Sequence, residues 1–229
     1  MPFPVPPFAL RIPRSLPLAA AVLAACPPAA LAEKDGAVSC GNLIYAGTKT
    51  SRCFSDEFLS TVQQKTSITT ERRFKAVKLG SDELFKFPFV IMTGEGEFTL
   101  TPAERDNLKR YLEGGGFLLA SPGCSSEPWA KSFEREIRQI FGKDALAPIK
   151  SDHAIFRTVF TVKELKLSHP GPVTPVLRGV TRRDKLVVVY SSDGLNDSHN
   201  AKGCCCCGGN EITNGREINA NILAYALLH

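Results

Sequence analysis

The chain has 229 residues, of which 43% are hydrophobic and 22% are charged, and its formal net charge is +5. This composition is that of an ordinary globular protein and not of a disordered or fibrous one, and the length allows one large domain. The basic residues are scattered and have no aromatic residues interleaved among them, so the sequence does not predict a nucleic-acid partner.

Residues 1–32 have the order of an export signal. They contain no acidic residue, and Arg11 and Arg14 precede an apolar run over residues 16–25 that is followed by small residues. This run is too short to cross a hydrocarbon core, which needs about 20 apolar residues. We therefore expect an exported protein, periplasmic or extracellular, without a transmembrane span.

Two processing sites compete in this signal. Ala30-Leu31-Ala32 fits a signal-peptidase site, whereas Leu23-Ala24-Ala25-Cys26 fits the box at which a lipoprotein is cut and lipidated on its cysteine. We favour cleavage after Ala32 and keep a lipoprotein anchored through Cys26 as the alternative. Without residues 1–32 the chain has 26 basic and 23 acidic residues, and its net charge falls to +3.

Residues 33–229 predict a single domain in which strands and helices alternate. Short unbroken apolar runs indicate strands covered on both faces, and apolar residues at helical spacing indicate the helices between them. In chain order we expect a strand at 43–46, a helix at about 55–65, an edge strand at 74–79, a strand at 89–92, a helix at 101–114, a strand at 117–120, a helix at 127–141, a strand at 186–190 and a last helix from 214. This order predicts an α/β fold, a three-layer sandwich with a largely parallel sheet and helices on both faces.

Two helix starts carry capping signals. Thr101-Pro102-Ala103-Glu104 combines a threonine N-cap, a proline at the first helical position and the glutamate of a capping box. Asn214-Gly215-Arg216-Glu217 predicts a second capping box. Trp129 is expected in the core, at helical spacing with other apolar residues. Prolines interrupt residues 151–180, where we expect short strands or a hairpin.

The loops that follow the parallel strands meet at one edge of such a sheet, where ligands bind. Gly94 and Gly96 follow the strand at 89–92 and would allow a ligand close to the backbone, while Glu95 would act as an acid, a base or a ligand; a tight turn with a solvated glutamate is the alternative. The long loop 191–213 contributes Asp193 and His199 as candidate ligand-binding residues, because loops of this length are usually functional or disordered.

Cys124 occupies the turn between a predicted strand and a predicted helix. Amidotransferase-like and hydrolase-like folds place a nucleophile at such a turn, where backbone amides stabilise a thiolate or an oxyanion. The Gly-x-Cys-x-Gly pattern of a nucleophile elbow is absent, and no partner histidine is fixed by the sequence. His153 and His199 are the candidates for a catalytic base, and each is also explained by a structural role.

Seven cysteines follow the export signal, namely Cys40, Cys53, Cys124 and the run Cys204-Cys205-Cys206-Cys207. Disulfides are the plainest expectation for an exported loop. Cys204 and Cys207 also have C-x-x-C spacing, so a zinc site completed by His199 or Cys124 is a second interpretation, and a redox role is a third.

Several ordered motifs carry a family resemblance. They are Glu83-Leu84-Phe85-Lys86-Phe87-Pro88-Phe89, Met92-Thr93-Gly94-Glu95-Gly96, Gly115-Gly116-Phe117-Leu118, Ser132-Phe133-Glu134-Arg135-Glu136 and Asp152-His153-Ala154-Ile155-Phe156. Together they resemble the bacterial domain-of-unknown-function family 4159, from about residue 68 to the C-terminus. The resemblance implies a flavodoxin-like fold related to class I glutamine amidotransferases, and it implies no established activity. Many relatives have proline where this chain has Ala154, and the cysteine run looks like a feature of a subgroup.

Three functions follow from these observations. The first is a ligand- or partner-binding module of the cell envelope, which holds a small molecule or an envelope protein at the carboxyl edge of the sheet. The second is a Cys-dependent amide or ester hydrolase that uses Cys124. The third is a metal-binding or redox protein that uses Cys204 and Cys207, with zinc as its candidate cofactor.

Overall fold

One sheet organises the part of the chain that the computed structural model describes, which is residue 1 and residues 36–169, 171–172, 174–201 and 210–229. The predicted export signal, including Cys26, and the run Cys204 to Cys207 lie outside these residues. The described strands are β1 (Cys40–Ile44), β2 (Lys75–Lys78), β3 (Phe89–Met92), β4 (Phe117–Ala120), β5 (Ala147–Pro148), β6 (Arg178–Arg182) and β7 (Lys185–Tyr190).

The strand order in the sheet is β2-β1-β3-β4-β7-β6-β5. The first five of these strands are parallel, and β6 pairs antiparallel with both β7 and β5. The predicted largely parallel sheet is therefore confirmed, and β2 lies at an edge as predicted. The order 2-1-3-4 followed by one more parallel strand is the flavodoxin-like arrangement of a doubly wound sheet.

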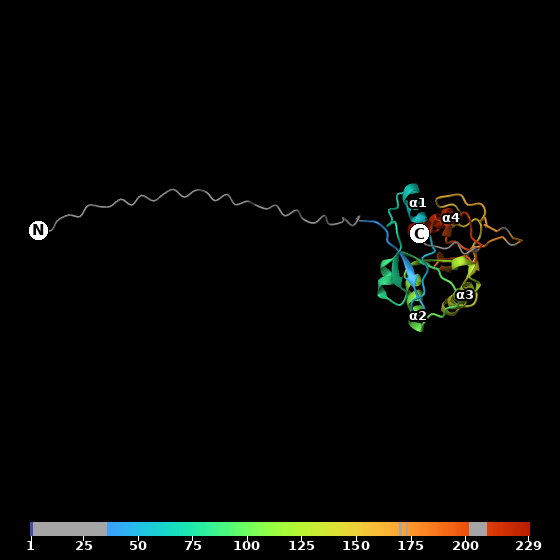
Figure 1. Ribbon diagram of the computed structural model, residues 1–229, viewed down its shortest axis with the longest axis horizontal. Coiled ribbons are helices and arrows are strands. Elements are labelled where there is room, and N and C mark those ends of the chain that lie inside the picture. Colours follow the sequence, from blue (N-terminus) through green and yellow to red (C-terminus); the bar gives the residue numbers. More distant parts are fainter. Residues whose placement is uncertain (2–35, 170, 173, 202–209) are drawn as a thin grey trace. The chain divides into compact units, whose positions relative to one another are not determined.

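Helices cover both faces of this sheet (Figure 1). On one face, α1 (Glu57–Lys65) packs against α4 (Gly215–Leu228), and on the other, α2 (Pro102–Glu113) packs against α3 (Glu127–Phe141). Each face has its own hydrophobic cluster, because alternate strand residues point to opposite sides. The three-layer α/β sandwich is confirmed. No helix among the described residues is long and apolar enough to span a membrane.

Local sequence signals account for the best-predicted elements. Thr101 Oγ1 accepts a hydrogen bond from the Glu104 backbone N–H, and a Glu104 side-chain oxygen accepts one from the Thr101 N–H, so the predicted capping box of α2 is present. Strands β3 and β4 are buried along their whole length, as their unbroken apolar runs predict. Trp129 on α3 has no exposed surface, which confirms its place in the core.

Three local features of the described fold differ from the sequence prediction. The capping box at Asn214 is wrong: its side chain instead accepts a hydrogen bond from the Lys166 N–H and donates one to the Glu164 carbonyl. Strand β1 begins three residues earlier than predicted and ends at Ile44, because pairing with β2 and β3 extends it through Gly41 and Asn42. Residues 151–177 hold a short 3-10 helix, η3 (Ala154–Phe156), and no named strand among those described, and the hairpin forms between β6 and β7.

Candidate functional site

The strand order reverses in the sheet between the parallel strands β1 and β3, which makes the carboxyl ends of these strands the expected ligand crevice. A buried aromatic pair fills this place. Tyr45 follows β1, and its hydroxyl donates to the Thr93 carbonyl oxygen at 3.1 Å and accepts from Trp129 Nε1 at 2.5 Å. Burial raises the pKa of Tyr45 to about 12. This hydroxyl therefore acts as a structural link between β1, β3 and α3.

Both glycines predicted to approach a ligand have structural roles within the protein. A Cβ atom on Gly94 would lie 2.3 Å from the Tyr45 hydroxyl, so this position has room only for glycine. Gly96 has φ +68°, and its N–H donates to Ser126 Oγ at 3.1 Å. That N–H is already engaged and is not offered to a ligand.

Cys124 lies on a strained turn between β4 and α3. It has φ +50° and ψ +32°, and the next residue, Ser125, has φ +51°. Two consecutive non-glycine residues in the left-handed region store backbone strain, which occurs most often at functional sites. The structure brings Cys124 to Glu95, with Sγ 3.3 Å from Glu95 Oε1, and it shows Cys124 in a disulfide. Its thiol is therefore available only after reduction.

His153 lies at the opposite end of the sheet from Cys124. Its Nδ1 accepts a hydrogen bond from the Ile155 N–H, and its ring lies 5.2 Å from that of Tyr225 on α4. Tyr225 in turn contacts Phe117, the first residue of β4, whereas Cys124 follows the end of this strand. The structure does not bring His153 and Cys124 together. Burial lowers the pKa of His153, which favours the neutral ring that this capping contact needs.

The remaining predicted site residues belong to the loop between β7 and α4. Asp193 is partly buried, and burial raises its pKa. His199 lies exposed in the short 3-10 helix η4 (Ser198–Asn200). Cys204 and Cys207 lie outside the described residues. Within the described ranges, no group of three or more histidine, cysteine, aspartate or glutamate side chains is arranged to hold a metal ion.

Asn196 links the carboxyl-edge loops, a role that the sequence did not predict. Its side chain is buried, and Nδ2 donates to the Pro122 carbonyl oxygen at 2.8 Å while Oδ1 accepts from Thr93 Oγ1 at 3.4 Å. Its backbone carbonyl accepts from the Ser55 N–H at 2.8 Å. One residue thus connects the loops that follow β1, β3, β4 and β7. A single asparagine in a polar loop gives no sequence signal for such a role.

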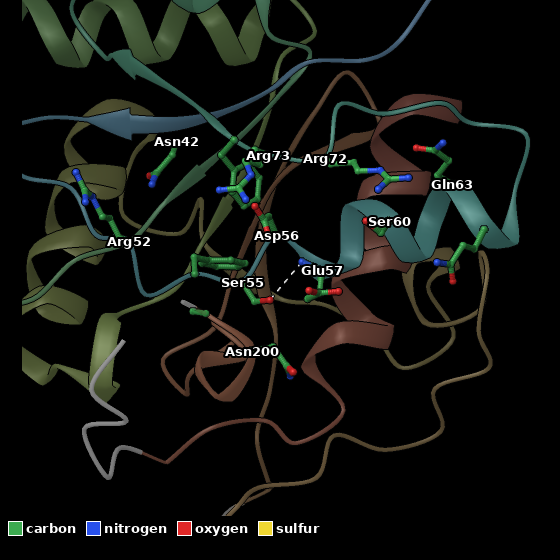
Figure 2. A pocket seen from close by; sticks show the side chains of 14 residues that line it. Asn42, Arg52, Ser55, Asp56, Glu57, Ser60, Gln63, Arg72, Arg73 and Asn200 are labelled. Carbon is green, nitrogen blue, oxygen red and sulfur yellow. Dashed lines mark hydrogen bonds between the residues drawn. The ribbon is translucent and has the colours of Figure 1, made fainter. Parts of the chain in front are cut away.

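A polar pocket of about 910 Å³ lies beside α1, on the α1 face of the sheet (Figure 2). We call it the α1 pocket. Its walls come from strand β1, the loop before α1, the exposed side of α1, the segment before β2 and the end of η4. The lining residues are Asn42, Arg52, Phe54, Ser55, Asp56, Glu57, Ser60, Gln63, Gln64, Arg72, Arg73, Phe74, Asn200 and Ala201.

The path of the chain after β1 builds this pocket. A backbone pair between Tyr45 and Lys49 closes a turn, and the chain then runs back over β1, where Asn42 Nδ2 donates to the Ser51 carbonyl oxygen at 2.8 Å. This return brings Phe54 onto Phe74, the residue before β2, with ring centroids 6.2 Å apart. The two phenylalanines line the pocket together with charged and amide side chains.

Comparison with known protein families matches residues 43–227 to one described as a domain of unknown function (DUF4159). The chain belongs to this family. The match runs from within β1 to the last turn of α4, so it covers strands β2 to β7 and nearly all of the described helices α1 to α4. No curated protein matches the chain.

In this DUF4159 domain the two candidate sites differ in what they can do. The carboxyl edge is largely filled by protein contacts, and among the described residues predicted for a site there, Cys124 and Glu95 lie together. The α1 pocket has space within the usual range of about 300–1,000 Å³ for a small-molecule site. Its lining is rich in hydrogen-bonding groups, and none of the described residues that line it is a cysteine or histidine.

Proposed function

We propose that this DUF4159 domain is a binding module of the cell envelope and that its ligand, a small polar molecule, binds in the α1 pocket. The observation that carries the proposal is the pocket itself, with its volume of about 910 Å³ and its lining of charged, amide and hydroxyl side chains around two phenylalanines. The volume lies in the range of small-ligand sites, and a lining of this polarity suits a polar ligand. The envelope location rests on the export signal in residues 1–32.

Hydrogen bonds within the protein hold the walls of the α1 pocket in place. The Ser55 N–H donates to the Asn196 carbonyl oxygen, and Ser55 Oγ accepts from the Glu57 N–H at 3.2 Å, a contact drawn in Figure 2. Thr50 Oγ1 donates to Asn42 Oδ1 at 3.4 Å on the opposite wall. Such pre-formed walls reduce the entropy that binding must offset.

Filling the pocket tests the proposal. Ser60 lines it from α1, so Ser60→Trp places a bulky ring in the ligand's space, while Thr61→Trp adds the same ring on the same helix outside the lining. The exported protein is screened against a library of small polar molecules by thermal shift. We expect a ligand that stabilises wild type and Thr61→Trp and has no effect on Ser60→Trp. A ligand that stabilises all three proteins equally, or no ligand at all, contradicts the proposal.

A Cys124-dependent amide or ester hydrolase is a second candidate, favoured by the strained strand-to-helix turn and by the neighbouring Glu95 carboxylate. Such a turn exposes a nucleophile in hydrolase-like folds. Because Cys124 is disulfide-bonded, activity toward activated esters should appear only after reduction and should disappear in Cys124→Ala. Hydrolysis by the reduced protein that persists in Cys124→Ala excludes this candidate.

A further inference from the structure

The α1 pocket contains three guanidinium groups that come from different parts of the chain. Arg52 lies in the loop before α1, and Arg72 and Arg73 lie in the segment before β2. In the view of Figure 2, Arg72 and Arg73 are drawn in the same part of the pocket, and Arg52 is drawn apart from them, beyond Asn42. Segments distant in the sequence thus contribute the same chemical group to one cavity.

These arginines differ from most others in the chain. In the described part of the structure, none of Arg52, Arg72 and Arg73 forms an ion pair, and none donates a hydrogen bond. Most of the other described arginines form an ion pair; for example, Arg105 binds Glu136, and Arg216 binds Asp197. The guanidinium groups of the pocket therefore keep their donors for another partner.

The two described carboxylates of the pocket do not fully neutralise the positive charge of its guanidinium groups. Asp56 and Glu57 occupy the N-cap and the first turn of α1, where the helix dipole stabilises negative charge. Among the described lining residues, these two carboxylates stand against three guanidinium groups, so the lining has a formal excess of one positive charge. An anionic group would bind to the guanidinium groups, and hydrogen-bond donors on the rest of the ligand would bind to Asp56 and Glu57.

We infer that the ligand of the α1 pocket is a small polar molecule with a carboxylate or phosphate group, which Arg72 and Arg73 bind with support from Arg52. This inference rests on the proposed function and adds the chemical class of the ligand. Guanidinium groups match both carboxylates and phosphates with paired, charge-assisted hydrogen bonds. The amides of Gln63 and Asn200 would then bind the uncharged part of the ligand.

Calorimetric titration of the exported protein with inorganic phosphate and, separately, with succinate tests the inference at constant ionic strength. The double variant Arg72→Gln/Arg73→Gln removes two charges, and Arg157→Gln, an exposed arginine outside the pocket lining, is the control. We expect one or both anions to bind wild type and the control, with binding weakened by about tenfold or more in the double variant as charge-assisted contacts are lost. The anion that binds identifies the group.

Two results overturn the inference. One is that the anion binds equally well to wild type and to the double variant, while the double variant keeps the unfolding midpoint of wild type. The other is that neither anion binds, while an uncharged polar molecule still binds and is excluded by Ser60→Trp; in that case the proposed function stands and the ligand is not an anion. If nothing binds in a manner sensitive to Ser60→Trp, the proposed function fails as well.

Discussion

Replacing Asn196 by alanine should destabilise the domain more than any exposed substitution in the same loop. The side chain is 1% exposed and satisfies two buried groups, the Pro122 carbonyl oxygen and the Thr93 hydroxyl. Alanine retains the backbone carbonyl that accepts from the Ser55 N–H, so the substitution removes only the side-chain links. The carboxyl-edge loops then keep their positions through packing and backbone contacts alone.

The magnitude follows from the two groups left without partners. A buried polar group that loses its hydrogen bond costs about 1–3 kcal/mol. The Thr93 contact is long, at 3.4 Å, and contributes at the lower end, so the total loss should be about 2–4 kcal/mol. For a domain of this size each kcal/mol lowers the unfolding midpoint by roughly 2–4 °C.

Thermal and urea unfolding of wild type, Asn196→Ala and Asn200→Ala measure this loss. Asn200 is the matched control, because it lies in the same loop, is exposed, and donates a single hydrogen bond to Asp197. We expect a clear drop for Asn196→Ala and a change within about 0.5 kcal/mol for Asn200→Ala. Equal stabilities for the two variants would refute the reasoning that Asn196 links the loops.

Three further predictions concern other parts of the domain. Gly94→Ala should have a thermal unfolding midpoint several degrees below that of wild type, because the new Cβ would lie 2.3 Å from a buried tyrosine hydroxyl. Gly80→Ala, whose Cβ would have an ordinary 3.7 Å contact, should leave the midpoint nearly unchanged. Equal midpoints for the two variants would disprove the packing argument. Iodoacetamide at pH 8 should label Cys53 and leave Cys40 unmodified until the protein unfolds, since burial raises the pKa of the Cys40 thiol to about 12. Peptide mass spectrometry measures the labelling, and labelled Cys40 in the native protein would contradict this prediction. Finally, burial lowers the pKa of His153 in the folded state, so the unfolded state takes up a proton at this residue first as the pH falls. The free energy of unfolding should therefore decrease as the pH drops below about 6.5. His153→Gln should reduce the slope of the free energy of unfolding against pH, and an unchanged slope would exclude His153 as its source.

Local signals were sufficient to predict much of the fold. Strands β3 and β4 and helix α3 begin and end where their apolar patterns begin and end, and the capping box fixed the start of α2. The prediction of strand β1 was less accurate, because Gly41 and Asn42 interrupt its apolar run. Only pairing with two neighbouring strands makes these residues part of the sheet. Tertiary pairing overrode the local pattern there.

The candidate site divides in the same way. That Cys124 and Glu95 meet followed from the topology, because both belong to loops at the carboxyl ends of adjacent strands. The α1 pocket was not predictable, since Arg72 and Arg73 resemble solvated surface residues and line the same pocket as Arg52 only because the chain turns back after β1. The sequence around His153 likewise does not indicate at which end of the sheet this residue lies.

The most direct test of a ligand site in the α1 pocket is an amide NMR titration of the protein with the ligand found in the screen. The account predicts that the largest shift changes fall on Ser55, Glu57 and Ser60, which line the pocket, and that the Gly94 amide at the carboxyl edge changes little. Largest changes at Gly94 and around Cys124, with the α1 residues unaffected, would contradict it and would place the ligand at the carboxyl edge of the sheet.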